Sequence, residues 1–293
     1  MYVMPQQNFS AYNDSDRHPQ NAIWGDYPYD QKDRHPTQWI YWFDDFTFVP
    51  SLTSATTAVN RWPYMSYIDT GNTIVALATT KTIGVLRLSV DASDNDGPVI
   101  TLPGDASVAF MLDDNTAADR RKLWFDARWK KSSVTDNQCA VFIGLTEEAR
   151  AVDNGLMADD SAVITTTIDA IGWRVLQDNG EELDFVWQKA SQTPVELVAA
   201  AVTTTNSDAT GLVADTYIKT GFKYDPERPA ANRIATYINN VQGTAWGTAT
   251  QMAAATFPDG EELVFAAGAK AGEATAVTFD IDWIRMAQKG LDV

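Results

Sequence analysis

Val277-Thr278-Phe279-Asp280-Ile281-Asp282-Trp283, close to the end of the chain, is the stretch that decides the fold. Its apolar residues alternate with threonine and aspartate, which is the pattern of a β-strand with one buried face and one polar face. All four apolar side chains of the stretch, Trp283 included, are therefore predicted to face a core. Helical periodicity is almost absent elsewhere, which favours an all-β protein.

The same alternation recurs upstream, most cleanly over residues 123–130, where Leu, Phe, Ala and Trp share one face. Asn179-Gly180 stands between two alternating runs, residues 171–176 and 183–187, and this dipeptide is a strong hairpin signal. Residues 217–224 and 233–238 form a second candidate hairpin. Short strands at this spacing predict an all-β, antiparallel two-sheet jelly-roll sandwich.

The chain divides into two regions of different composition. Residues 1–38 are rich in Asn, Gln, Asp, Pro and Tyr, and they are predicted to form an extended N-terminal arm. Residues 39–293 are predicted to form the β-sandwich domain, although residues 39–115 could also form a small leading subdomain. The arm holds too many aromatic residues for a solubilising tail, so it is expected to lie on a surface, either its own domain or a neighbouring subunit.

Several short phrases resemble known families. The run Leu-Trp-Phe-Asp-Ala-Arg-Trp from Leu123 and the closing Asp-Trp-Ile-Arg from Asp282 are similar to concanavalin A-like lectin and glucanase sandwiches. Together with Trp-Phe-Asp-Asp-Phe from Trp42, the chain also resembles capsid decoration or head-stabilising (cement) proteins of tailed bacteriophages. That resemblance implies a non-enzymatic virion structural protein on the outer capsid surface, made in the host cytoplasm, which binds the assembled major capsid protein.

The arm supplies the residues predicted to contact this partner. Its aromatic residues would act as anchors, and its basic residues would pair with acidic groups of the capsid. The predicted partner-binding residues are Tyr2, Phe9, Tyr12, Arg17, Trp24, Tyr27, Tyr29, Lys32 and Arg34. Neighbouring copies of the chain are further expected partners, since closed homo-oligomers are the common arrangement of decorating subunits.

The charge balance excludes two classes of partner. The chain has 22 basic and 39 acidic residues, for a formal net charge of −17 at pH 7. Nucleic-acid binding needs a basic footprint, and adhesion to an anionic membrane needs basic residues too. No nucleic acid and no membrane is therefore expected as a partner. No signal peptide or membrane span is recognised either, and the single cysteine, Cys139, lies in an apolar run as a small buried side chain would.

Catalytic chemistry is weakly represented. Glucanases on this scaffold use neighbouring carboxylates on one face of a strand, and Glu182 with Asp184 has the i, i+2 spacing. The next same-face residue is Val186, so the pattern is incomplete, and no enzyme activity is predicted. The turn at residues 91–97 offers oxygen ligands for calcium but lacks the EF-hand spacing. No cofactor and no metal is predicted.

Three tryptophans remain candidates for ligand contact. Trp62, Trp124 and Trp246 stand among polar neighbours, as a sugar platform or an interface anchor would. A carbohydrate-binding module, free or carried by a virion, is therefore the alternative function. A glycoside hydrolase that uses Glu182 is a weaker alternative.

Overall fold

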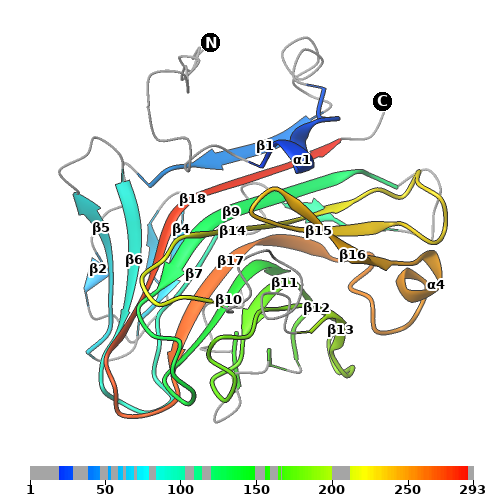
Figure 1. Ribbon diagram of the computed structural model, residues 1–293. Helices are drawn as coiled ribbons and strands as arrows, with labels where there is room; N and C mark the ends of the chain where they lie inside the picture. The colour runs from blue at the N-terminus through cyan, green and yellow to red at the C-terminus, as the bar shows by residue number, and fades with distance from the viewer. Residues whose placement is uncertain are drawn as a thin grey trace.

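The computed structural model describes most of the chain as two facing β-sheets (Figure 1). The residues that it describes are 20–28, 39–46, 52–53, 59–61, 64–68, 71–78, 84–102, 109–113, 120–148, 156–158, 164–165, 167–199 and 212–289. Two helices occur in these ranges, α1 (Asn21–Trp24) and α4 (Ala249–Met252), and each is a single turn.

Over the described residues, each sheet has nine strands. Sheet A has the order β16-β15-β14-β9-β18-β6-β5-β2, and β1 also pairs with β18. Its strands are β1 (Trp39–Asp44), β2 (Leu52–Thr53), β5 (Thr73–Ala78), β6 (Gly84–Val90), β9 (Leu123–Lys131), β14 (Ile218–Tyr224), β15 (Ile234–Ile238), β16 (Val241–Gly247) and β18 (Val277–Lys289).

Sheet B has the order β13-β12-β11-β10-β17-β7-β4-β3, and β8 also pairs with β17. Its strands are β3 (Val59–Arg61), β4 (Tyr64–Tyr67), β7 (Val99–Thr101), β8 (Phe110–Met111), β10 (Cys139–Glu147), β11 (Ala170–Val175), β12 (Asp184–Gln188), β13 (Val195–Val198) and β17 (Glu262–Ala271). Strands from the first part of the chain contribute to both sheets: β1 and β6 pair with β18, and β7 and β8 pair with β17.

Both hairpins predicted from turn chemistry are present. Strands β11 and β12 pair antiparallel around the Asn179-Gly180 turn, and β14 pairs with β15. A side chain at Gly180 would meet the main-chain carbonyl oxygens of Val134 and Thr135, at 2.6 and 2.8 Å from its Cβ. Glycine is therefore required there by the close approach of the 134–135 main chain.

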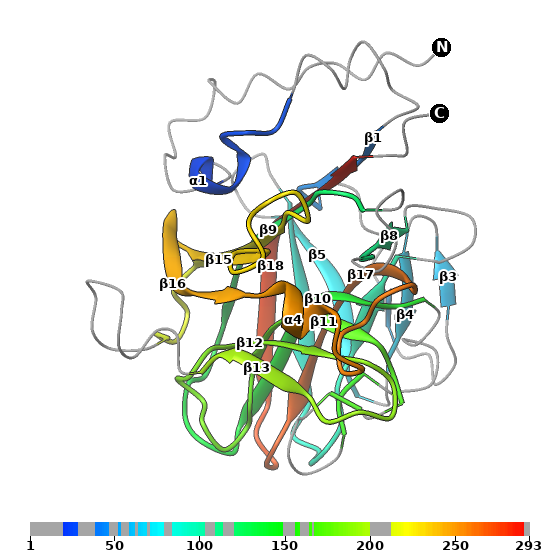
Figure 2. The ribbon, with the colours of Figure 1, turned by 90° about the vertical axis from the view of Figure 1, so that its right-hand side faces the viewer.

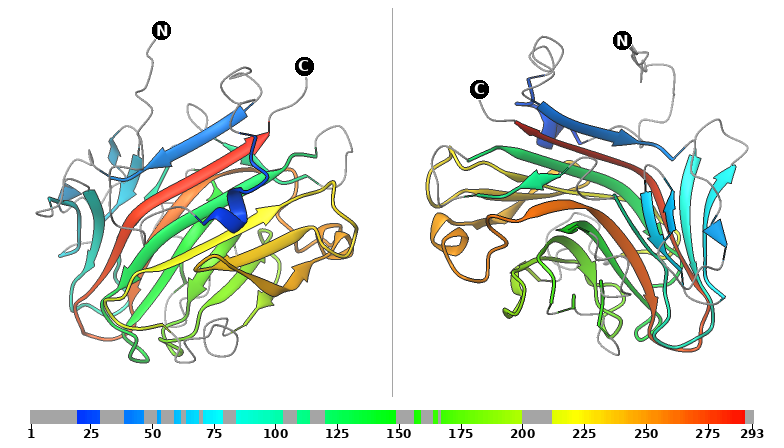
Figure 3. Two further views of the ribbon diagram at one scale, coloured as in Figure 1. Left: turned by 45° about the horizontal axis from the view of Figure 1, so that its top comes forward. Right: turned by 180° about the vertical axis from the view of Figure 1, so that it is seen from behind.

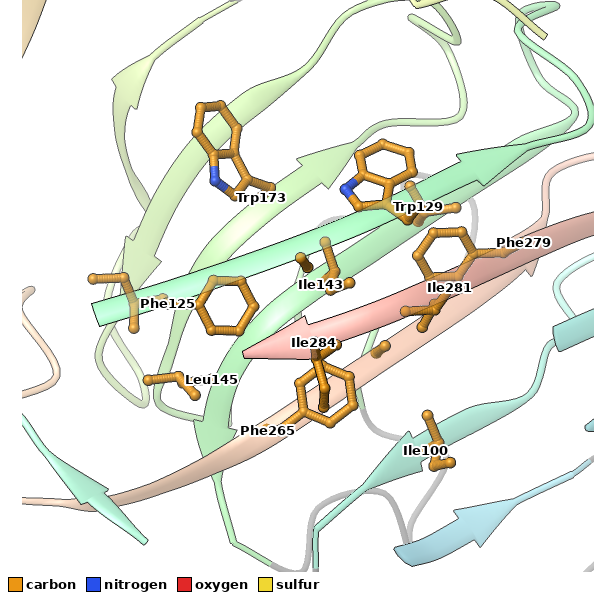
Figure 4. Packing of buried hydrophobic residues seen from close by; sticks show 14 of the residues in the cluster. Ile100, Phe125, Trp129, Ile143, Leu145, Trp173, Phe265, Phe279, Ile281 and Ile284 are labelled. Carbon is orange, nitrogen blue, oxygen red and sulfur yellow. The ribbon is translucent and has the colours of Figure 1, made fainter. Parts of the chain in front are cut away.

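The core lies between the sheets and is rich in aromatic rings (Figure 4). Phe222 of β14 has ring centroids 5.2 Å from both Phe125 of β9 and Phe185 of β12, so it joins the two layers. Leu123, Phe125, Ala127 and Trp129, the predicted apolar face of β9, are all buried in this cluster. Cys139 is buried there as well, as expected.

The closing strand departs from its predicted alternation at one point. The register of β18 against β9 shifts between Ile281 and Trp283, so Ile281 faces Trp129 whereas Trp283 faces Arg128. The extra residue of this β-bulge moves every later side chain to the opposite face. The prediction that Trp283 joins Phe279 and Ile281 in the core was therefore wrong. Trp283 is buried, but it shares a face with Arg128, and Ile284 takes the place in the core.

Candidate functional site: the strapped outer face of sheet A

The N-terminal part of the described chain lies across the outer face of sheet A. We call residues 20–28 the strap. Its helical turn, α1, contacts β9 and β14. Figure 2 and the left panel of Figure 3 show α1 on the outer side of this sheet. The turn is closed by a hydrogen bond from the main-chain N–H of Ile23 to the carbonyl oxygen of Gln20 (3.0 Å). A turn this short is stabilised by what it packs against rather than by its own hydrogen bonds.

A buried carboxylate holds the start of the strap. Asp126, on the outer face of β9, accepts hydrogen bonds from the main-chain N–H of Gln20 (2.8 Å), from Gln20 Nε2 (2.7 Å) and from Trp24 Nε1 (3.2 Å). Gln20 Oε1 in turn accepts the main-chain N–H of Asn240, in the turn between β15 and β16 (2.6 Å). Gln20 and Asp126 are both fully buried, so these bonds form away from water, where an unpaired polar group would be costly.

The electrostatics of this carboxyl group are unusual. Burial raises the pKa of Asp126 to about 7, although the hydrogen bonds from Gln20 and Trp24 and the nearby Arg285 charge act to lower it. Burial disfavours the charged form because the protein replaces water that would solvate the carboxylate. The group therefore titrates near neutral pH while it carries the strap.

A second, more exposed anchor lies at the other end of the strap. Asp26 accepts a hydrogen bond from Trp124 Nε1 (3.1 Å) and forms an ion pair with Lys223 of β14, and Lys122 Nζ lies 3.9 Å away. Partial burial raises the pKa of Asp26, but the contacts with Lys223 and Trp124 outweigh it and leave this pKa below its ordinary value. Each end of the strap is therefore held by a carboxylate, one from the sheet and one from the strap itself.

Aromatic packing fills the space between the two anchors. The Tyr27 ring makes edge contacts with Trp24 and Trp124, both at 5.3 Å between centroids, and with Trp39 of β1 at 5.5 Å. The Arg285 guanidinium lies 4.0 Å from the Trp24 ring centroid, which is a cation–π contact. The apolar side chains buried in this cluster are Ile23, Trp24, Tyr27, Trp124, Ala235, Tyr237 and Ala287.

A glycine on the sheet makes room for the strap. Gly221 of β14 faces outwards, and a Cβ at this position would collide with Ile23 Cδ1 of the strap and lie 2.5 Å from the Phe125 carbonyl oxygen. Any larger residue would therefore displace Ile23 and press on the neighbouring strand. The sheet surface and the strap are thus shaped to each other.

The structure corrects part of the predicted partner interface. Trp24 and Tyr27 were predicted to anchor a capsid partner, but they are 3% and 4% exposed and pack on their own domain. The reason is that the outer face of sheet A offers a complementary aromatic surface within the same chain. The other predicted arm residues lie outside the described residues and stay predictions: Tyr2, Phe9, Tyr12, Arg17, Tyr29, Lys32 and Arg34.

The three candidate tryptophans have different outcomes. Trp124 is 1% exposed beneath the strap, so its ring is not an open sugar platform in this structure; it anchors the strap instead. Trp246 of β16 is half-buried opposite Ala235, and the Arg228 guanidinium lies 5.4 Å from its ring centroid. Trp62 lies outside the described residues.

Further along the same face, carboxylates pair with basic groups. Arg87 of β6 binds both oxygens of Asp280 on β18, at 2.7 Å each, and Lys130 Nζ lies 3.7 Å from the same carboxylate. Asp282, at the β-bulge, pairs with Arg128 at 2.5 Å. Asp280 and Asp282 were predicted to form a plain polar face, and they are instead buried ion-pair partners, 2% and 1% exposed.

The outer face of sheet B holds the other carboxylates that were considered for catalysis. Arg174 of β11 contacts Asp184 at 3.4 Å and Glu196 of β13 at 2.7 Å, so it ties together β11, β12 and β13. Glu182 precedes β12 and lies in the turn rather than on the strand. Burial, with the nearby Asp184 charge, raises the pKa of Glu182. Glu182 and Asp184 therefore do not form a pair on one strand: Glu182 lies in the turn, and Asp184 is ion-paired with Arg174.

An apolar layer covers the centre of that face. Phe142 of β10 and Val186 of β12 belong to a second buried cluster, whose members from the next part of the chain are Leu156, Met157, Ile164 and Ile168. Gly144 and Gly172 face each other in the register of β10 and β11, and a Cβ on either would lie 3.0 Å from the Phe142 ring. The Phe142 ring therefore fills the space that larger residues would have occupied.

Metal ligands are not gathered in the part of the chain that the structure describes. There, no group of three or more His, Cys, Asp or Glu side chains could hold a metal ion. In the 91–97 turn, Asp91 Oδ1 accepts the main-chain N–H of Ser93 (2.9 Å), which is an ordinary Asx turn.

Neither of the two helices in the described ranges, α1 and α4, is long and apolar enough to cross a bilayer.

Four residues of the site were not identified from the sequence: Gln20, Asp26, Asp126 and Arg285. Asp126 occupies a polar position of an alternating strand, which normally faces solvent. The predicted alternation of the closing strand would place Arg285 on the buried face, and only the β-bulge turns it outwards, opposite Asp126. The one signal was Trp124, two residues before Asp126 on the same face of β9, because a large ring on a polar face suggests that another part of the protein covers it. Pairing with Gln20, more than one hundred residues away, carries no local sequence signal.

No protein-family model matches the chain, and no curated protein sequence matches it. Among solved structures, a protein of unknown function from Shewanella oneidensis MR-1 is similar over 90% of this chain and 95% of its own, with a TM-score of 0.53 and 14% identity. The endo-β-1,3(4)-glucanase SCLam of family GH16 covers 87% of this chain and 92% of its own, with a TM-score of 0.49 and 9% identity.

The basic lectin of winged bean is similar over 86% of this chain and 98% of its own, with a TM-score of 0.49 and 10% identity. At such identities these likenesses concern the fold alone. The two antiparallel sheets of the structure show an all-β, two-sheet jelly-roll sandwich, as the sequence predicted.

Proposed function

We propose that this chain is a non-enzymatic virion structural protein, a decoration or cement subunit of a tailed-phage capsid. It would bind the assembled major capsid protein and neighbouring copies of itself on the outer capsid surface, after synthesis in the host cytoplasm. Binding only the assembled shell stabilises that shell by mass action. The sequence resemblance to decoration proteins suggests this role, and the fold is compatible with it.

The observation that carries the proposal is the strap. Its amide, indole and phenol side chains bind a β-sheet face through a buried carboxylate and an aromatic cluster. Residues 1–19 hold side chains of the same kinds, at Tyr2, Phe9 and Tyr12, together with Arg17. These residues are the proposed contact with the capsid, because the strap leads directly into them and they carry the anchor chemistry that strap residues use.

The carboxylates support a role without catalysis. Retaining hydrolysis needs two carboxyl groups about 5 Å apart with separated roles. On the outer faces of both sheets, Asp184, Asp280 and Asp282 are paired with arginine side chains, and Asp126 accepts hydrogen bonds from the strap. Ion pairs of this kind hold strands in register and favour structural use of the acids.

The first test is the abundance of the chain in purified particles, measured by quantitative mass spectrometry relative to the main shell protein. A ratio near one, or a simple fraction of it, is expected. A few copies per particle would point to a vertex or tail component, and absence would contradict the proposal.

A second test assigns the contact. Full-length chain with Tyr2, Phe9 and Tyr12 all changed to Ser should lose most of its binding to undecorated particles. Full-length chain with Val241→Ser, an exposed position on β16, serves as the matched control and should bind normally. Equal occupancy by both variants would remove residues 1–19 from the interface.

Carbohydrate binding is the second candidate, and one feature favours it. Trp246 is half-buried beside Arg228 at the edge of sheet A, and a partly open indole next to a hydrogen-bond donor suits a sugar ring. A glycan array with full-length protein tests this idea. Trp246→Ala should abolish any saccharide signal without loss of fold, and a signal that survives this change would exclude Trp246 as the platform.

A further inference from the structure

The strap is joined to the sandwich by a link that is long for the gap it closes. The Tyr27 ring centroid lies 5.5 Å from that of Trp39, the first residue of β1. Residues 29–38 connect the two, and a link of that length reaches about 33 Å when extended. The length of the link therefore allows the strap to dock either on its own sheet or on another sheet within that reach.

The contacts themselves carry no preference for the same chain. The hydrogen bonds from Gln20 and Trp24 to Asp126, the Asp26 contact with Lys223, and the Ile23 seat over Gly221 all join the strap to one contiguous sheet face. An identical face on a second copy would accept an identical strap. Exchange of an identical element between copies makes the same contacts and is a low-cost route to assembly.

What favours the strap's own sheet is proximity. A flexible link of about ten residues still gives an effective concentration on the order of millimolar, so dilute chains keep their own straps. Copies held side by side reach comparable local concentrations. We propose that the strap also docks in trans, on the outer face of sheet A of a neighbouring copy, so that adjacent copies exchange straps. The inference depends on the proposed capsid role in one respect only: assembly on a capsid would hold the copies side by side.

The test uses two full-length variants. Asp126→Lys places a cation against the three N–H donors of the strap, so this donor variant has a free strap and a blocked face. Gln20→Ala with Trp24→Ala removes the side chains that bind Asp126, so this acceptor variant has an open face and a weak strap. Mixed at about 0.1 mM, well below the effective concentration of a linked strap, the two should form a 1:1 mixed complex in native mass spectrometry.

The matched control is a donor that also carries Gln20→Ala and Trp24→Ala. It should give at least tenfold less mixed complex with the acceptor. An equal amount in both mixtures would show a contact unrelated to the strap, and no mixed complex between folded variants would overturn the inference.

A second measurement does not need the donor to fold. A labelled peptide of residues 18–28 should bind the acceptor variant saturably in fluorescence anisotropy, and the same peptide with Trp24→Ala should bind at least tenfold more weakly. Absence of binding to an acceptor with a native circular dichroism spectrum would overturn strap exchange. Particle occupancy of the full-length chain is measured separately, so failure of exchange leaves the proposed capsid role standing.

Discussion

The outer face of sheet A buries aspartates in two regions, and each region closes over them differently. At the strapped end, Asp126 is covered by a distant segment and receives its hydrogen bonds from Gln20 and Trp24. At the other end, Asp280 and Asp282 receive arginines from neighbouring strands of the same sheet. The first solution joins a remote part of the chain to the sheet, whereas the second only joins strands that are already paired.

The difference has an electrostatic consequence. Neutral donors satisfy the oxygen atoms of Asp126 but do not neutralise its charge, so burial raises its pKa to about 7. A bidentate guanidinium supplies both hydrogen bonds and charge to Asp280. The stability of the strapped region should therefore change with pH near neutrality. The stability of the ion-paired region should change when one partner of an ion pair is removed.

The largest expected effect is the pH dependence that Asp126 introduces. Its pKa is about 7 in the folded protein, against an ordinary 3.8. At pH values between these two pKa values, the unfolded chain has released the Asp126 proton and the folded chain still holds it. The stabilising contribution of this proton is therefore complete at low pH and is lost as the pH rises through the folded pKa. The free energy of unfolding should fall by up to about 4 kcal/mol from pH 4 to pH 7. Urea titrations across this range measure it.

Asp126→Asn is the control for that slope. Asp44 and Asp169 also have pKa values raised by burial, and they act in the same direction, so the wild-type slope alone is not specific. The difference between wild type and the variant isolates Asp126. Parallel pH curves for the two proteins would mean that Asp126 does not titrate in this range.

Next in size is Trp24→Ala. The change removes a buried ring that packs on Tyr27 and Arg285 and donates to Asp126. Truncation of a buried aromatic residue typically costs about 3 kcal/mol or more. The free energy of unfolding should fall by about that amount, and strap amides should lose hydrogen-exchange protection. Trp246→Ala, at a half-buried position, should cost about 1 kcal/mol; equal losses would erase the distinction between the two rings.

Asp280→Ala should have an intermediate effect. It leaves Arg87 and Lys130 without their shared carboxylate, but both cations are partly exposed and can regain water. A loss of about 2 kcal/mol is expected, below the range for fully buried pairs. Arg87→Met combined with Asp280→Leu should restore most of it, as urea titrations of the two variants will measure. A double variant as unstable as the single one would show that the pair itself contributes net stability.

The smallest effect is expected for Asp26→Ala. This carboxylate is 42% exposed on its side chain, so water screens its contact with Lys223. A loss of about 0.5–1 kcal/mol is expected, reduced further in 1 M salt. A loss as large as that of Trp24→Ala would mean that the exposed anchor, rather than the buried one, holds the strap.

Local patterns predicted the sandwich well and the site poorly. The alternation of β9 and the Asn179-Gly180 hairpin depend on neighbours in sequence, and both are present. The face of Trp283 was predicted wrongly, because one bulged residue against β9 reverses the alternation. Trp24 and Tyr27 were recognised as anchors, but their partner is their own sheet.

By itself, the sequence determined the class of fold, the position of several strands along the chain, the net negative charge and the distinct composition of residues 1–38, because periodicity, turn residues and charge are properties of short stretches. Only the tertiary structure decided that Asp126 is buried, that Gln20 and Trp24 bind it, and that Arg174, Arg87 and Arg128 pair with the acids of the two outer faces. Most of these contacts join residues far apart in the chain, and burial is a property of what covers a residue rather than of its neighbours in sequence.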